Sequence, residues 1–446
     1  MPLLESDLIF SLAASDLKNA LGELKKSNLS ITNRLRSIKQ DADFVLSVSE
    51  AYNLPLIANE RCGSWYIPSD RKTGSAYFKS TDGHFGQWSF SLRRLNLQVL
   101  SIVEQHGGCI IVDSTRRGKS MPDALSKTVP IWIAVLNRLL FPEHTESHAL
   151  RTPAEVVSLS EHSQIESRLP LFLEGLGDLN VDLNGLRSTL TKPMRPVWVT
   201  PGGTLDASSL GESHGVCPII LVTSSNRESA GSHNVSKYVQ GAADDHESWA
   251  LGLDPAMFWA NMQQMLNTPE SELPSLISKL VVGAQAASRM RSPTLVRPST
   301  TIWIADNEAA ENLYRDFDTI VHCSAAPSAN LASKLKIRHV HLACSSGKNG
   351  SRQLRKELEK LAILRDMLSP MSKVLVTCET GRDLAVGAAL AILCSLYSND
   401  GTLHDQSTVA MSKSLIKQRL SWIMVSMPDA SPSRATLQSV NAHLMS

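Results

Sequence analysis

The stretch Gly107–Thr128, GGCIIVDSTRRGKSMPDALSKT, decides the fold class of the first half of this 446-residue chain. Its apolar run Cys109–Val112 predicts a short buried strand that ends in Asp113. Pro122 suits the first turn of a helix after the loop, and Pro130 should kink or break that helix. A buried strand, a polar loop and a helix in this order indicate an α/β fold.

The loop between this strand and this helix is rich in groups that bind phosphate. Hydroxyls, cations and a flexible glycine follow Asp113 within seven residues. Together with backbone N–H groups at a helix start, they suit a phosphate or a pyrophosphate. The spacing is not that of a nucleotide P-loop, and a basic surface turn is the alternative. The candidate phosphate-binding residues are Ser114, Thr115, Arg116, Arg117, Gly118, Lys119 and Ser120.

A second polar cluster lies in KYVQGAADDHESW, residues 237–249. Its adjacent carboxylates, Asp244 and Asp245, stand next to His246 and Glu247. Such carboxylates could hold magnesium together with substrate phosphates, or could deprotonate an attacking hydroxyl. If the segment is helical, neighbours point about 100° apart, so the four side chains cannot all face one site. The alternative is an acidic helix start with capping aspartates.

The stretch Lys373–Cys394, KVLVTCETGRDLAVGAALAILC, predicts another strand, turn and helix. Its turn resembles the phosphate loop of Cys-dependent protein phosphatases, whose pattern is His-Cys-x-x-Gly-x-x-Arg. Thr377 replaces the His, Leu384 stands where the phosphate-clamping Arg belongs, and an Arg appears two places early. We therefore expect anion binding at a helix N-terminus rather than phosphatase chemistry. The residues of this cradle are Cys378, Glu379, Thr380, Gly381, Arg382 and Asp383.

The length and the order of elements predict more than one domain. A chain of 446 residues with 42% hydrophobic and 20% charged residues is too long for one ordinary core and is typical of a folded protein. After residue 301, short strands and helices alternate, which indicates a mainly parallel sheet flanked by helices. Before residue 290, we expect a helical segment at 6–51 and short strands with loops at 59–90. Two further strands are expected at 195–201 and 217–225, and a long amphipathic segment at 234–267. The expected division is a first region 1–290, a Pro- and Ser-rich linker 291–300 and a last domain 301–446.

The net charge and the cysteines limit the functions and the cellular compartments that we expect for this chain. The net charge is only +1, so nucleic-acid binding would depend on local basic clusters, each of which is alternatively a solvated helix face. Seven scattered cysteines without a Cys-x-x-Cys pair fit a reducing compartment, the cytosol or the nucleus. We expect neither a secretory signal nor a membrane span. The basic clusters are Arg93 and Arg94, Arg116 to Lys119, Lys348 to Lys356, and Lys413 with Lys417 and Arg419.

Several segments together resemble the initiator-tRNA phosphoribosyltransferase family of fungi and plants. They are NERCGSWY (59–66), STDGHFGQWSFSLRRLNL (80–97), GGCIIVDSTRRGKSMPDALSKTVPIW (107–132), YVQGAADDHESWA (238–250), CETGRDLAVGAALAILC (378–394) and PSRATLQSVNAHLM (432–445). The resemblance implies a family-specific N-terminal α/β catalytic region and a C-terminal domain like the dual-specificity phosphatases. It implies magnesium-dependent transfer of 5-phosphoribosyl from phosphoribosyl pyrophosphate to the 2′-hydroxyl of the purine at position 64, in the T stem of initiator methionine tRNA. This mark would exclude the initiator from elongation.

The charges of that reaction suggest residue roles. Positive charge develops on the ribose and negative charge on pyrophosphate, so cations and a metal should dominate catalysis. We assign Arg116, Arg117 and Lys119 to the pyrophosphate, and Asp113, Asp244 or Asp245 to the metal and the sugar hydroxyls. The other candidates are Asp82 and His84 for the acceptor proton, and Arg93, Arg94, Lys348 and Arg352 for RNA.

We expect the chain to be a monomer whose partners are initiator methionine tRNA and phosphoribosyl pyrophosphate. A Cys-dependent phosphatase acting on RNA or protein, or a tRNA-binding protein without catalysis, are the alternatives.

Overall fold

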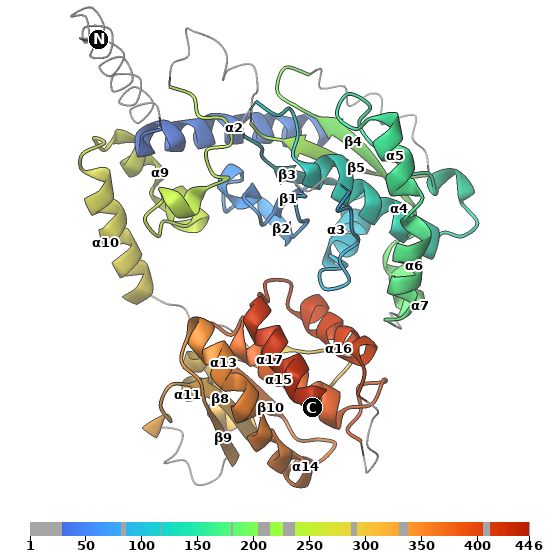
Figure 1. Cartoon of the computed structure of the whole chain (residues 1–446). Helices are drawn as coiled ribbons and strands as arrows, with labels where there is room; N and C mark the ends of the chain where they lie inside the picture. The colour runs from blue at the N-terminus through green and yellow to red at the C-terminus, as the bar shows by residue number, and fades with distance from the viewer. Residues whose placement is uncertain are drawn as a thin grey trace, which may run out of the picture. The chain divides into compact units, whose positions relative to one another are not determined.

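Two units, each with its own sheet, make up the chain (Figure 1). The computed structural model describes residues 29–81, 86–116, 118–179, 182–203, 215–225, 237–286, 292–329, 338–404 and 411–445. The N-terminal unit comprises residues 1–90, 99–169 and 183–287, and the C-terminal unit comprises residues 91–98, 170–182 and 288–446.

The sheet of the N-terminal unit has five parallel strands in the order β2-β1-β3-β5-β4. The strands are β1 (Leu56–Asn59), β2 (Lys72–Ala76), β3 (Cys109–Asp113), β4 (Met194–Val199) and β5 (Cys217–Thr223). The central strand β3 is buried along its whole length, as its apolar sequence predicts. In the register of β3 and β5, Asp113 lies beside Thr223, so polar residues meet at the carboxyl edge of the sheet.

Helices cover both faces of this sheet, as parallel strands require (Figure 1). Helices α2 (Ile31–Tyr52), α9 (Pro255–Asn267) and α10 (Leu273–Ala286) pack on the face that carries Ala58, Val112 and Val222. Helices α3 (Gln98–His106) and α4 (Val129–Leu140) lie on the other side. The shorter helices of this unit are α5 (Leu159–Glu166) and α7 (Leu183–Thr189), whereas α6 (Leu169–Gly177) falls almost wholly in the C-terminal unit.

The expected effect of Pro130 is confirmed, whereas one expected segment is wrong. A π-helical turn, Ala124–Thr128, precedes α4, and Pro130 is the second residue of that helix. Of the expected amphipathic segment 234–267, the described part is helical only from Pro255, because residues 237–250 form turns and a short 3-10 helix. Gly241 has a φ of +62°, which a right-handed helix does not allow. Asp245 directly precedes the short 3-10 helix His246–Ser248, but its side chain makes no capping hydrogen bond there.

The sheet of the C-terminal unit confirms the expected mainly parallel architecture. Its order is β6-β7-β10-β8-β9, and only β6 is antiparallel to its neighbour. The strands are β6 (Thr294–Leu295), β7 (Ile302–Asp306), β8 (Thr319–Ser324), β9 (Arg338–Ala343) and β10 (Val374–Cys378). The short β6 lies within the stretch expected as a linker.

Helices also cover both faces of this second sheet. On one face, the apolar core is built with α13 (Gly347–Glu357), α15 (Leu384–Leu396), α16 (Lys413–Ser426) and α17 (Arg434–Leu444). Helix α11 (Asn307–Leu313) packs on the other face, and the short α14 (Leu364–Met367) precedes β10. Among the helices in the described part of the chain, none is long and apolar enough to cross a membrane.

Candidate functional site

Polar side chains meet where two neighbouring strands of the N-terminal sheet end. Strand β1 ends at Asn59 and β3 ends at Asp113, and Asn59 Nδ2 donates to Asp113 Oδ2 at 2.8 Å. The amide of Asn59 is itself held by the backbone of Phe78, through bonds of 3.0 and 2.8 Å. In α/β proteins, the carboxyl ends of parallel strands are where ligands bind. A ligand-binding site is therefore expected at this edge of the sheet.

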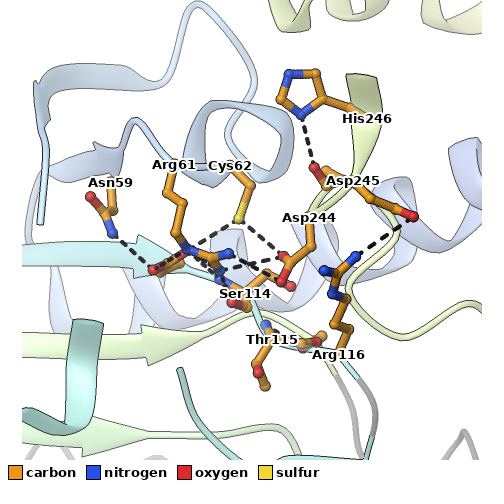
Figure 2. Close-up of polar contacts among 12 residues, drawn as sticks. Asn59, Arg61, Cys62, Ser114, Thr115, Arg116, Asp244, Asp245 and His246 are labelled. Atoms are coloured by element: carbon orange, nitrogen blue, oxygen red, sulfur yellow. Dashed lines mark hydrogen bonds and ion pairs between the residues drawn. The ribbon is translucent and has the colours of Figure 1, made fainter. Parts of the chain in front are cut away.

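Arg61 lies between two carboxylates at this edge (Figure 2). Its Nη2 donates to Asp113 Oδ1 at 2.9 Å and its Nε donates to Asp113 Oδ2 at 3.2 Å. Its Nη1 donates to Asp244 Oδ2 at 3.2 Å, and Nη2 also donates to the carbonyl oxygen of Ser114. Asp113 is fully buried and the Asp244 side chain is 5% exposed. With both carboxyl groups ionised, the three side chains carry a net charge of −1.

The thiol of Cys62 completes this buried cluster. Its Sγ lies 3.1 Å from Asp113 Oδ1 and 3.2 Å from Asp244 Oδ1, so its single proton is donated to or shared between these two oxygens (Figure 2). Burial, and then the two carboxylates, raise the pKa of Cys62 well above its usual value, so the thiol stays protonated as a donor. Burial also raises the pKa of Asp244, although Arg61 opposes that rise. Asp244 therefore takes up a proton more readily than a solvent-exposed aspartate does.

The loop after β3 is held in place by backbone contacts. Thr115 N donates to Ser225 Oγ at 3.2 Å, and Ser225 Oγ donates to Thr115 O at 2.8 Å. Gly241 packs so closely on this loop that a β-carbon there would lie 2.4 Å from Thr115 O. The two polar clusters of the sequence, at 114–120 and at 237–249, therefore lie side by side.

A second link between these loops is more exposed. Gln240 accepts from Gly118 N at 2.9 Å and donates to Lys119 O at 2.8 Å. Arg116 Nη1 lies 3.7 Å from Asp245 Oδ2, with the two side chains 42% and 36% exposed. Exposed ion pairs at this distance contribute little stability, so Arg116 is available to a ligand.

The carboxylate of Asp245 does not join that of Asp244 in the Arg61 cluster, because Arg34 binds it. Arg34 Nη1 donates to Asp245 Oδ1 at 2.9 Å and to Ala242 O at 3.2 Å, and its guanidinium stacks 5.4 Å from the ring centre of Trp249. Within the described ranges, no group of three or more His, Cys, Asp or Glu side chains is arranged to hold a metal. Arg61 occupies the space between Asp113 and Asp244 that a cation would take. These residues do not fit a preformed magnesium site, and the metal stays a prediction.

Two family models match this chain. A model described as the Rit1 N-terminal domain matches residues 24–282, and a model described as the Rit1 DUSP-like domain matches residues 338–444. The chain belongs to the Rit1 family. This confirms the family resemblance seen in the sequence, and the DUSP-like match agrees with the α/β fold expected for the last domain.

Individual relatives agree with the family assignment. A Saccharomyces cerevisiae protein named tRNA A64-2′-O-ribosylphosphate transferase is 34% identical, over 95% of this chain and 94% of its own length. An uncharacterized protein of Schizosaccharomyces pombe is 37% identical, over 93% of this chain and 94% of its own. Among solved structures, the Yvh1 phosphatase domain from Chaetomium thermophilum is 17% identical and covers 34% of this chain and 94% of that chain, with a TM-score of 0.26. The DUSP-like assignment rests on the family model and not on this structural score.

The phosphatase-like turn of this Rit1 chain differs from a phosphate loop in its cations. Arg382 Nη2 lies 3.2 Å from Asp429 Oδ2, and Ser431 N donates to Arg382 O at 2.9 Å. Asp383 Oδ1 accepts from Ser433 N at 2.8 Å and from Thr436 Oγ1 at 2.5 Å. Both residues therefore hold the segment that leads into α17.

A hollow of about 430 Å³ lies over Cys378 in the DUSP-like domain. Glu379 and Asp383 line it, and no Lys or Arg does so among the described residues. Leu384, at the position of the phosphatase arginine, is almost fully buried. Two carboxylates without a lining cation do not favour an anion, and anion binding by this turn stays a prediction.

The basic clusters expected to bind RNA differ in how far their side chains are exposed. Lys348 and Arg352 are exposed on α13, and Arg93 is exposed as well. Arg419 is fully buried, donates to Tyr397 O at 3.1 Å and stacks over the ring of Trp422. Its inclusion in a surface cluster was wrong, because it fills the core of the C-terminal unit. RNA binding by the exposed residues stays a prediction.

Three of the expected site residues lie outside the described residues, and two residues of the site were not predicted from the sequence. Asp82, His84 and Arg117 belong to the first group. Arg61 and Cys62 belong to the second, although a signal for them exists in the sequence. They follow the apolar strand 56–59 just as Ser114 and Thr115 follow the strand 109–113. Residues after neighbouring parallel strands meet at one edge of a sheet.

Replacing Arg61 with methionine should destabilise the N-terminal unit by about 3–5 kcal/mol at pH 7, because two buried carboxylates lose their cation. The pKa of Asp244, already raised by burial, should then rise further. A carboxyl whose pKa is higher when folded stabilises the fold below its unfolded pKa, and that contribution is lost as the pH rises through its folded pKa. The deficit should therefore shrink from pH 7 to pH 5.

Urea unfolding at both pH values measures this effect. Arg71→Met, at an exposed arginine of the same unit, is the control and should show no such deficit. An Arg61→Met deficit that is absent at pH 7, or equally large at both pH values, would contradict the role given to Arg61.

Proposed function

We propose that this chain transfers 5-phosphoribosyl from phosphoribosyl pyrophosphate to the 2′-hydroxyl of the purine at position 64 of initiator methionine tRNA. The observation that carries the proposal is 34% identity, over 95% of this chain, to a protein named tRNA A64-2′-O-ribosylphosphate transferase. That name contains the acceptor class, its position and the transferred group. The donor and the choice of the initiator follow from the family resemblance and are part of the proposal.

The cluster around Arg61 suits the electrostatics of this transfer. The bond from ribose C1 to pyrophosphate breaks with its electron pair on pyrophosphate, and the 2′-oxygen forms the new bond at C1. Positive charge develops on the ribose as the old bond lengthens. A neighbouring cluster with one more carboxylate than cations stabilises that charge.

Asp244 is the proposed acceptor of the 2′-hydroxyl proton. Its pKa is raised by burial, which makes it a better base than an ordinary aspartate. Asp113 is fully buried, with both oxygens bound by Arg61 and further bonds from Asn59 and Cys62. We therefore give Asp113 a positioning role, in which it fixes Arg61 and, through Arg61, Asp244.

The loop at 114–120 is the proposed site of the leaving pyrophosphate. Arg116 is available there because its pair with Asp245 is long and exposed. We propose that magnesium enters with the pyrophosphate oxygens, the ligands that it commonly uses in such sites. Asp113 and Asp244 already have a cation in Arg61.

We also propose that the enzyme works in a reducing compartment, the cytosol or the nucleus. All seven cysteines are free and buried. Proteins from oxidising compartments more often pair their cysteines.

The direct test incubates the full chain with labelled phosphoribosyl pyrophosphate, magnesium and total tRNA, and then maps the labelled nucleotide. We expect label on initiator methionine tRNA at position 64. No label on any tRNA, or equal label on elongator tRNAs, would overturn the proposal. Phosphate release from RNA without label would instead favour a phosphatase.

Asp244→Asn should lower the transfer rate by about 10²–10⁴, because it removes a general base while keeping the shape of the side chain. Stability should hardly fall, since Asp113 and Arg61 remain paired. Asp245→Asn is the matched control at the neighbouring, more exposed position and should lose less. Single-turnover rates at saturating donor and tRNA measure both variants. Equal losses in the two would contradict the assignment of the base.

Cys378→Ser should leave transfer nearly unchanged, because the proposed chemistry needs no thiolate and the DUSP-like domain lacks the clamping arginine at Leu384. The same transfer assay, beside a circular-dichroism check of folding, measures it. A folded but inactive serine variant would place the chemistry in the C-terminal unit.

A further inference from the structure

A hollow of about 500 Å³ lies beside β4, the edge strand of the N-terminal sheet. Arg195 and Trp198 of β4 line it together with Arg151, Thr152 and His162. Trp198 Nε1 donates to the carbonyl of Leu125 at 2.9 Å, which fixes one wall of the hollow. Thr152 Oγ1 and His162 Nδ1 are 2.8 Å apart and fix another. The hollow is therefore formed before any ligand arrives.

Among the described residues, the arginines of this hollow have no counter-ion. Arg151 and Arg195 are exposed, and within the described ranges neither makes an ion pair or a side-chain hydrogen bond. No Asp or Glu is among the described residues that line the hollow. An adjoining hollow of about 160 Å³ shares both arginines and includes Glu146. The carboxylate of Glu146 is in contact with His144, whose Nδ1 lies 3.3 Å from Glu146 Oε1.

This contrasts with three arginines near the Arg61 cluster, which have carboxylate partners. Arg34 and Arg116 pair with Asp245, and Arg61 pairs with Asp113. Two arginines without a partner at a preformed concave surface favour an anionic ligand, and a guanidinium is well suited to phosphate. The hollow therefore has the chemistry of a phosphate site.

The register of the sheet separates Arg195 of this hollow from the Arg61 cluster. Arg195 lies beside Pro218 on β5, whereas Asp113 lies beside Thr223 on the same strand. Five residues of a parallel strand span roughly 16 Å. A ribose bound with its phosphates at the cluster is too short to reach the hollow. An RNA stem carries phosphates along both strands and can contact both places at once.

We propose that Arg151 and Arg195 bind backbone phosphates of the acceptor RNA, on a part of the stem away from the 2′-hydroxyl that reacts. This inference rests on the proposed function, since it names a contact of the same tRNA. It adds an RNA surface that neither the basic clusters of the sequence nor the phosphate loop at 114–120 includes.

The test compares tRNA affinity of the full chain over a range of salt concentrations. Arg151→Ala with Arg195→Ala should weaken binding by about tenfold or more and lower the salt slope by about two, one for each lost phosphate contact. Arg195→Lys should keep most of the slope, because it keeps the charge and loses only the fork of donors. Arg71→Ala, an exposed arginine next to the opposite edge strand β2, is the control and should behave as wild type. The KM for phosphoribosyl pyrophosphate should stay unchanged in the double variant.

Three results would overturn the inference in different ways. Affinity and slope like those of Arg71→Ala would show that RNA does not contact the hollow, and would leave the proposed function standing. A raised KM for the donor with normal tRNA affinity would make the hollow a donor site. A wild-type chain that binds no tRNA at any salt concentration would remove the proposed function together with this inference.

Discussion

The buried contact of Arg61 with Asp113 and Asp244 is the interaction on which the rest of the N-terminal site depends. It joins three segments far apart in the sequence: the turn after β1, the end of β3 and the loop at 237–250. Burying two ionised carboxylates without a cation would cost several kcal/mol for each ion, so the arginine stabilises the loop in this position. Asp245, the next residue in this loop, is bound by Arg34 and lies 3.7 Å from Arg116.

The two units use the same local design with different charges. In each, a buried parallel strand ends in a polar turn, Asp113–Ser114 in one and Cys378–Glu379 in the other. The first turn has Arg61 beside it, whereas Arg382 of the second turn pairs with Asp429. A strand-turn-helix unit therefore supplies backbone donors in both places, but only the charged side chains around it determine what each turn can bind.

The strands could be predicted from sequence because their signal is local. The apolar runs 109–113, 302–306 and 374–378 are all strands, and the alternation after residue 301 gave the parallel sheet. Arg61 could not be predicted in the same way, because its partners lie 52 and 183 residues away. The expectation failed at 237–254 for a related reason. Gly241 takes a positive φ so that it can pack on Thr115, and a periodic pattern contains no trace of that contact.

A nearly neutral protein can still present strong local fields if its charges are sorted in space. The net charge of the chain is +1, yet the Arg61 cluster has an excess carboxylate, and the hollow at β4 has two arginines that no described residue pairs with. About 16 Å of strand separates the register positions of Arg195 and Asp113, and the Debye length is about 8 Å at physiological ionic strength. The two fields therefore do not cancel in solution. In the proposed reaction, the negative field acts where the ribose becomes positive, and the positive field acts where the RNA backbone lies, so binding and catalysis do not compete for the same charges.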